Sequence, residues 1–114
     1  MESVIKLLLA ANKVPILPHI QYVLPNNGGG LDPAVIAKFN LAIDQLVAKY
    51  TLLPAPDMYS WFQAHPDELC APADKCGESQ WDGIQPIDLP SRPGISNTIR
   101  LWAAATNAAG VYTN

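Results

Sequence analysis

The stretch 80-QWDGIQPIDLP-90 places a carboxylate, a glycine, an amide and a proline on one short segment. This set of side chains raises the question of acid–base chemistry. The amide of Gln85 does not titrate near neutral pH, so Gln85 cannot act as a general base. Asp82 followed by Gly83 is, taken by itself, a common turn pair. The residues alone therefore favour a polar turn over a complete catalytic set.

The two histidines are the other candidates for chemistry. His19 lies inside the apolar stretch 14-VPILPHIQYVLP-25, and His65 lies far from it in the chain. Lone histidines without paired ligand spacing are more typical of structural residues than of metal ligands, so the sequence indicates no metal site. A catalytic set that joins His65 to Asp57 or Asp67 stays open as an alternative.

The two cysteines, Cys70 and Cys76, flank a short polar loop that lacks zinc or redox signatures. This pattern predicts a disulfide and an oxidising compartment, so we expect a secreted or periplasmic protein. Two free thiols in a cytosolic protein are the alternative. The start of the chain, residues 1–15, is not typical of a signal peptide, because its apolar run is short and Glu2 stands where positive charge is expected.

Two further features fit ligand binding but have commoner structural explanations. The glycines in 25-PNNGGG-30 could cradle a phosphate, but no Gly-Lys-Ser/Thr follows them, so a plain connection is favoured. A platform for stacking sugars is conceivable, although aromatic residues at such spacings more often belong to the core. The aromatic residues concerned are Trp61, Phe62, Trp81 and Trp102.

Composition narrows the class of protein. The chain has 114 residues, 49% of them hydrophobic and 15% charged, which indicates one globular domain with a core. The net charge is −3 and no basic cluster is present, which argues against a nucleic-acid partner. No apolar run approaches the roughly 20 residues of a membrane span, so no membrane partner is expected.

Hydrophobic periodicity predicts helices and strands in alternation. Helices are expected at 3–12, from Asp32 to Tyr50, at 60–69 and at 96–109, with Ser3 and Asp32 as N-caps. The stretch 14–25 predicts a strand buried on both faces, and a second, shorter strand or extended segment follows residue 51. The long helix is expected to bury the stripe of Val35, Ile36, Phe39, Ile43, Leu46, Val47 and Tyr50. The last helix is expected to bury Ile99, Leu101, Trp102 and Ala103.

This order predicts an α/β fold across residues 1–114, in which crossover helices connect the strands of a parallel sheet. Two strands are few for a stable sheet. The chain is therefore expected to be part of a doubly wound, flavodoxin-like fold, as a single α/β domain or fragment.

Several segments appear in an order known from one hydrolase superfamily. Residues 31–109 resemble the C-terminal half of an SGNH/GDSL-type ester hydrolase, and residues 14–27 fit the strand before it. In that superfamily the segment near the last helix reads Asp-Gly-x-His-Pro. The matching segments are 14-VPILPHIQYVLPNN-27, 39-FNLAIDQL-46, 57-DMYSWFQAHPDEL-69, 82-DGIQP-86 and 100-RLWAAA-105.

The resemblance implies serine chemistry on an ester, without a cofactor. In such enzymes a serine attacks the carbonyl, a histidine takes its proton and an aspartate orients the imidazole. Asp82 matches that aspartate, and Gln85 occupies the position of the histidine. The Gly-Asp-Ser block of the nucleophile and the Gly and Asn of the oxyanion hole have no match in this sequence.

The resemblance therefore implies a C-terminal segment of an esterase-like hydrolase that is inactive alone and meets an ester substrate only when an N-terminal half completes it. The rival interpretation is a small non-catalytic α/β domain that assembles with itself or binds a partner. Because apolar helix faces and an apolar strand edge would lack neighbours, we expect a homo-oligomer.

Overall fold

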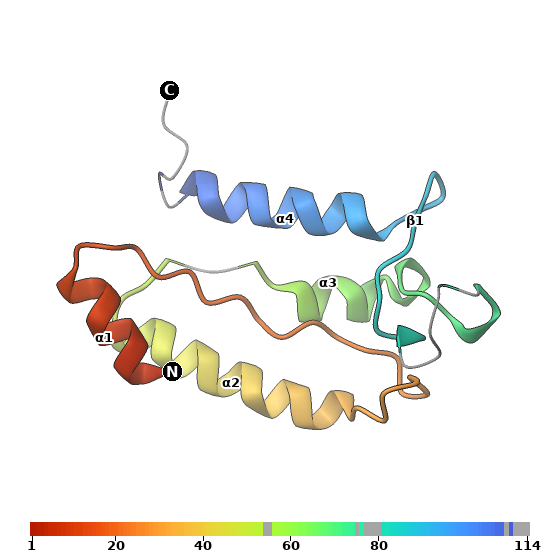
Figure 1. Cartoon of the computed structure of the whole chain (residues 1–114), viewed down its shortest axis with the longest axis horizontal. Helices are drawn as coiled ribbons and strands as arrows, with labels where there is room; N and C mark the ends of the chain where they lie inside the picture. Colours follow the sequence, from red (N-terminus) through yellow and green to blue (C-terminus); the bar gives the residue numbers. More distant parts are fainter. Residues whose placement is uncertain (54–55, 75, 77–80, 109, 111–114) are drawn as a thin grey trace.

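The computed structural model describes residues 1–53, 56–74, 76, 81–108 and 110. Within these residues lie four α-helices and two short 3₁₀ helices (Figure 1). An antiparallel pair of two-residue strands aligns Asp88 with Pro93 and Leu89 with Arg92. None of the described helices has the length and apolar character to cross a membrane. The elements are α1 (Glu2–Ala10), α2 (Pro33–Lys49), α3 (Met58–Ala64), η1 (Pro66–Glu68), η2 (Pro72–Asp74), β1 (Asp88–Leu89), β2 (Arg92–Pro93) and α4 (Gly94–Ala108).

Residues 14–25 form an extended segment that runs between α2 on one side and α3 and α4 on the other (Figure 1). Leu17 packs with Ile5 and Ile43 on one side, and Tyr22 and Leu24 pack against the cluster around Phe62 on the other. The expected burial from two sides is therefore only partly present, since Val14 and Ile20 are exposed. The segment forms no β-ladder with any described residue, and Pro15 and Pro18 have no N–H to donate to one. The parallel doubly wound sheet stays a prediction.

The long helix α2 begins where the sequence predicts. The Asp32 side chain accepts a hydrogen bond of 2.9 Å from the Ala34 N–H, and Pro33 occupies the first turn, which confirms the predicted cap. The predicted helix at 60–69 is shorter and starts earlier. Asp57 caps α3 through the Ser60 N–H, and Pro66 ends it, because a proline ring cannot continue a helical hydrogen-bond ladder.

The predicted stripe of α2 is only partly buried. Ile36 and Ile43 are buried, but Phe39 is 59% exposed and Val35 is 45% exposed. A polar residue, Asn40, is also buried, at 5% exposure, between Ile36 and Ile43. The described residues cover one flank of the helix and leave the flank with Val35 and Phe39 open.

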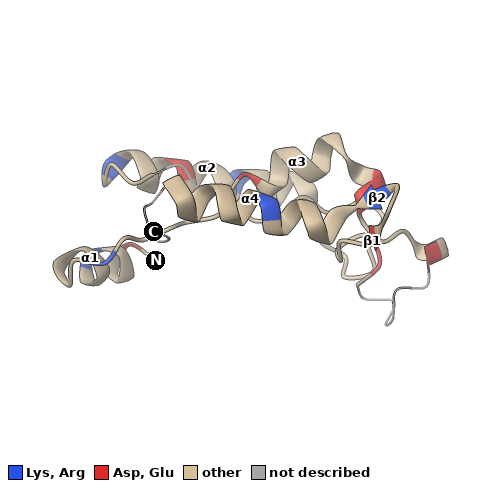
Figure 2. Ribbon diagram, turned by 90° about the horizontal axis from the view of Figure 1, so that it is seen from above, with Lys and Arg blue, Asp and Glu red and all other residues tan. Residues whose placement is uncertain are grey.

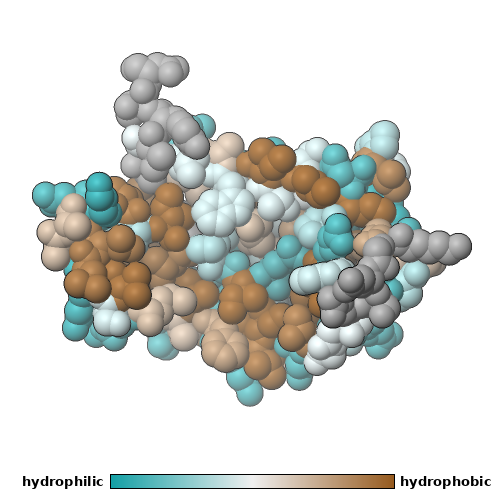
Figure 3. All heavy atoms as spheres, viewed as in Figure 1, coloured by the Kyte–Doolittle hydropathy of each residue, from teal (hydrophilic) through white to brown (hydrophobic). Residues whose placement is uncertain are grey.

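The outer helices also bury less than predicted. In α4 the expected burial of Ile99 and Ala103 is wrong, since both are exposed, while Ala105 is buried. In α1 only Ile5 is buried, and Met1 rather than Ser3 occupies the N-cap position, without a side-chain hydrogen bond. Figure 3 shows the resulting hydrophobic surface.

Charged residues are distributed without a dominant sign. Figure 2 shows acidic and basic residues scattered over the described elements rather than gathered on one face. This distribution agrees with the absence of a basic cluster in the sequence.

Candidate catalytic turn

Asp82 and Gln85 lie on one turn, 82–86, whose shape depends on Gly83. Gly83 has a φ of +77°, a conformation that residues with a side chain rarely adopt. A Cβ at this position would also lie 3.0 Å from the Asn27 backbone and 3.1 Å from the Leu24 side chain. The glycine therefore allows both the turn and its close approach to the end of the extended segment.

Three hydrogen bonds attach the turn to residues 21–28. The Leu24 N–H donates to the Gly83 carbonyl and the Gly28 N–H donates to the Asp82 carbonyl, each at 2.8 Å. The side chain of Gln21 donates to the Ile84 carbonyl at 2.5 Å. The turn is thus fixed at the C-terminal end of the segment that lies between the helices.

Buried Asn27 holds this end of the segment in place. Its amide donates to the carbonyls of Leu24 and Leu31 at 2.8 and 2.6 Å and accepts from the Leu31 N–H at 2.9 Å. These bonds close the loop that contains the three glycines. The sequence carries no signal for this role beyond the frequency of asparagine in turns.

The opposite side of the turn is attached to Cys70. The Gly83 N–H donates to the Cys70 carbonyl, and the Cys70 N–H donates to the Gln85 carbonyl at 2.8 Å. Leu69 forms an isolated antiparallel bridge with Pro86. With the backbone held from both sides, the Asp82 side chain is half-buried and that of Gln85 is exposed.

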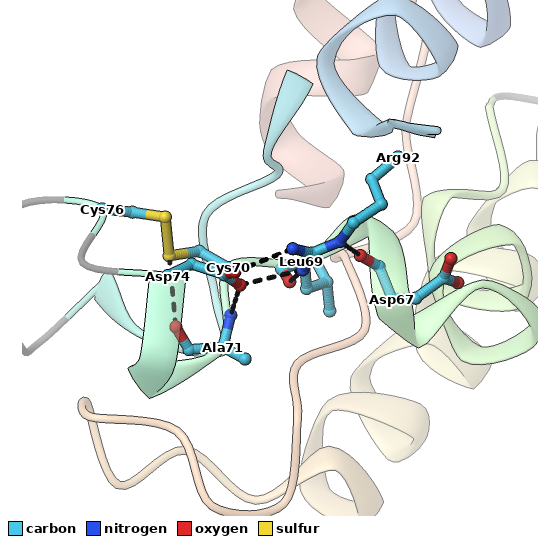
Figure 4. A network of polar contacts seen from close by, with 7 residues as sticks. All are labelled: Asp67, Leu69, Cys70, Ala71, Asp74, Cys76 and Arg92. Atoms are coloured by element: carbon cyan, nitrogen blue, oxygen red, sulfur yellow. Dashed lines mark hydrogen bonds and ion pairs between the residues drawn. A yellow bond between two sulfur atoms is a disulfide. The ribbon is translucent and has the colours of Figure 1, made fainter. Parts of the chain in front are cut away.

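A disulfide holds Cys70, and an ion pair holds the residues around it (Figure 4). The Cys70 sulfur lies 1.98 Å from that of Cys76, as a disulfide. Arg92 contacts both carboxylate oxygens of Asp74 at 2.8 Å, and it donates to the carbonyls of Asp67 and Leu69 at 2.5 and 3.1 Å. The Arg92 hydrogen bonds, with one from the Ala71 N–H, lower the pKa of Asp74 to about 2.

The same contacts argue against a metal ion at this cluster. The sulfur atoms of Cys70 and Cys76 and a carboxylate oxygen of Asp74 lie close enough to one another to hold a metal ion. Their sulfur atoms are bonded to each other, and the Asp74 carboxylate is bound by Arg92. These atoms therefore already have partners within the loop and are not free to coordinate a metal ion.

Neither histidine lies at the turn. His65 stacks on Trp61 at 4.0 Å, and its Nδ1 lies 2.8 Å from the Trp61 carbonyl oxygen. Asp57, one of its suggested partners, instead contacts His19 at 2.9 Å. Among the described residues, the contacts of both histidines are therefore made away from Asp82.

A buried acid that the sequence analysis did not single out joins α3 to α4. Glu68 accepts hydrogen bonds from Trp61 Nε1 at 2.7 Å and from Asn97 Nδ2 at 2.8 Å. Arg100 lies over the Trp61 ring at 4.6 Å. Of the four aromatic residues considered for sugar binding, Phe62 is fully buried, whereas Trp81 is exposed and Trp61 and Trp102 are half-buried. Phe62 is therefore a core residue.

Comparison of the chain with protein-family models, with curated proteins and with solved structures finds no match.

Proposed function

We propose that the chain is the C-terminal portion of an SGNH/GDSL-type ester hydrolase whose active site needs an N-terminal half. The observation that carries the proposal is the turn 82–86, which is hydrogen-bonded to the end of an extended apolar segment between helices. In this proposal Asp82 is the carboxylate that orients the base. Gln85 stands at the position of the base, so the chain alone does not hydrolyse esters.

Two features of the turn support these roles. Its backbone is bonded to Leu24 and Gly28 on one side and to Cys70 on the other, which gives residues 82–85 a fixed frame. The side chain at position 85 is exposed, and a base must reach a nucleophile that comes from elsewhere in the fold. An aspartate three residues earlier on the same frame can contact an imidazole at that position.

The proposed complement supplies the remaining chemistry. A Gly-Asp-Ser block would bring the serine, and donors from the same half would stabilise the oxyanion. Its strands would pair with the extended segment 14–25 and complete a parallel doubly wound sheet. The proposed substrate is an ester, no cofactor takes part, and the disulfide favours a secreted or periplasmic location.

Restoring the base tests this proposal. The chain is co-expressed with an N-terminal half of an SGNH hydrolase that carries Gly-Asp-Ser, and hydrolysis of p-nitrophenyl acetate is measured. Gln85→His is expected to raise kcat by roughly 10⁴-fold or more over the unchanged chain, because loss of a triad base costs at least that much in a studied protease.

Two variants serve as controls. Gln85→Asn keeps an amide at the position and is expected to stay inactive, and Asp82→Asn added to Gln85→His is expected to lose most of the gain. Co-purification of the two halves establishes that the complex is present. In such a complex, equal activity of the unchanged chain and the Gln85→His variant would show that this position does not face the nucleophile.

The second candidate function is a small non-catalytic domain that binds itself or another protein. It is favoured by open apolar grooves, since a groove of 420 Å³ lies between α1 and the extended segment and another of 470 Å³ lies beside Phe39. Self-association without any binding to an SGNH N-terminal half would select this function over the hydrolase.

A further inference from the structure

His19 lies between two carboxylates that come from different parts of the fold. Its Nε2 is 2.6 Å from Asp44 Oδ1 on α2, and its Nδ1 is 2.9 Å from Asp57 Oδ1, the N-cap of α3. The histidine side chain is only 19% exposed, whereas both carboxylates reach solvent. Among the described residues these two aspartates are the charged groups that face it.

The protonation state of His19 decides how many of these contacts it can make. An imidazolium carries an N–H on both nitrogens and can donate to both aspartates. A neutral imidazole carries one N–H, so one nitrogen then presents a lone pair to a carboxylate. The neutral form keeps one hydrogen bond and replaces the other with a repulsive contact.

The three residues connect elements that otherwise share few polar contacts. Next to His19, the Asn40 side chain bonds both backbone groups of Ile20, at 2.6 and 2.9 Å, and ties the extended segment to α2 alone. The His19 N–H donates to the Pro56 carbonyl at 3.3 Å, just before α3. The Tyr59 hydroxyl of α3 also donates to the Pro33 carbonyl of α2 at 3.1 Å, and among the described residues of the extended segment His19 is the one whose side chain contacts both α2 and the N-cap of α3.

We propose that His19 is a pH-dependent clamp, which as an imidazolium holds α2 and the start of α3 against the extended segment and releases one of them when it loses its proton. The inference does not depend on the proposed hydrolase. It assigns a function to a histidine that the catalytic turn does not use.

The direction of the pH effect follows from the surroundings of His19. Burial by itself lowers the pKa of His19, but the hydrogen bonds to Asp44 and Asp57 outweigh it and raise the pKa above 6.5. A pKa that is higher in the folded chain means that the clamp contributes fully below the unfolded value near 6.5 and is lost as pH rises through the folded value. At low pH the clamp ends when Asp57 is protonated. The pKa of Asp57 lies below 3.8, because hydrogen bonds from Ser60 and His19 outweigh its burial.

Nuclear magnetic resonance titration of the two histidines tests the clamp directly. The imidazole signals are followed from about pH 5 to about pH 9 in the folded chain and in the chain unfolded by urea. His19 is expected to titrate at higher pH in the folded than in the unfolded chain, and Asp44→Asn is expected to lower its folded value. A folded value at or below the unfolded one would overturn the proposal.

Urea unfolding of variants provides an independent measurement. Between about pH 6 and about pH 9 the folding constant of the unchanged chain is expected to fall roughly tenfold more than that of His19→Gln, which is the size of one charge-assisted hydrogen bond. His65→Gln is the matched control and is expected to keep the full pH dependence. Parallel curves for the unchanged chain and His19→Gln would refute the clamp. The titration of the unchanged chain decides the question even if His19→Gln does not fold.

Discussion

Two regions of the molecule satisfy their side chains in different ways. In the turn region, of which the structure describes residues 67–74, 76 and 81–94, polar groups form hydrogen bonds with one another, and a disulfide and an arginine bonded to several acceptors hold the chain. In the helical flank, residues 1–50, large apolar side chains such as Leu7 and Phe39 remain exposed. The region that carries the candidate chemistry is held by a disulfide, an ion pair and hydrogen bonds, some of them to residues 21–28, whereas the flank presents surface suited to association.

The contrast matters for function because the two regions meet at the candidate site. Leu24 of the extended segment and Gly28 just after it bond to the turn, and the other end of the segment packs through Leu17 against α1 and α2. A partner that covered the flank would contact the same segment that positions Asp82. Rigidity at the turn and openness at the flank are both compatible with a site that is completed by association.

The first prediction breaks the turn region and has the largest expected effect. Gly94, at the start of α4, is buried, and a Cβ there would lie 2.7 Å from the Ile87 carbonyl oxygen and closer still to that of Glu68. Both neighbours are backbone atoms and cannot rotate away. Gly94→Ala is expected to reduce the free energy of unfolding by roughly 3 kcal/mol, measured by urea denaturation.

Gly30→Ala is the control for this substitution. Gly30 has a φ of +66° and no atom within 4 Å of a Cβ, so only backbone strain of about 1 kcal/mol is expected. If Gly94→Ala were no more destabilising than Gly30→Ala, the packing of η1, β1 and α4 in the turn region would differ from that described.

The sequence predicts local features of this fold better than distant ones. The start of α2 was predictable because Asp32 and Pro33 act within one helical turn. The pair β1 and β2 was not, since strands of two residues show no alternation. Asn40 reads as an interruption of an apolar stripe, and its partner Ile20 lies twenty positions away.

The same distinction applies to the candidate site. That Asp82 and Gln85 share a turn follows from their separation and from Gly83 between them. That the turn is held by Leu24 and by Cys70 depends on contacts between residues far apart in the chain, which carry no local pattern. Exposure of Phe39 could not be predicted either, because helical periodicity identifies an apolar face but not whether the chain covers it.

The second prediction loosens the turn region without altering its side chains. Reduction of the bond between Cys70 and Cys76 is expected to lower the free energy of unfolding by roughly 2 kcal/mol, because the loop it closes is short. Melting curves with and without reductant measure the effect. Mass spectrometry of the unreduced protein should show a deficit of two hydrogens, and two thiols that alkylate readily in the native protein would contradict the bond.

The third prediction concerns the helical flank, where the expected change in stability is smallest and the expected change in association is large. Phe39 and Val35 are exposed beside Ile20 and line the 470 Å³ groove, so we expect a homodimer or a higher closed oligomer. Phe39→Ser should alter the free energy of unfolding of the monomer by no more than about 0.5 kcal/mol, since an exposed side chain loses few contacts. Burying a phenylalanine at an interface stabilises it by roughly 1.5–3 kcal/mol, so the dissociation constant should rise at least tenfold.

Light scattering after size exclusion over a wide dilution range measures the change in the dissociation constant. Gln45→Ser, on an exposed polar position of the same helix, is the control. A cooperatively folded monomer that persists at high concentration would show that the flank is stable uncovered, and the turn region and the flank would then not differ in their need for a partner.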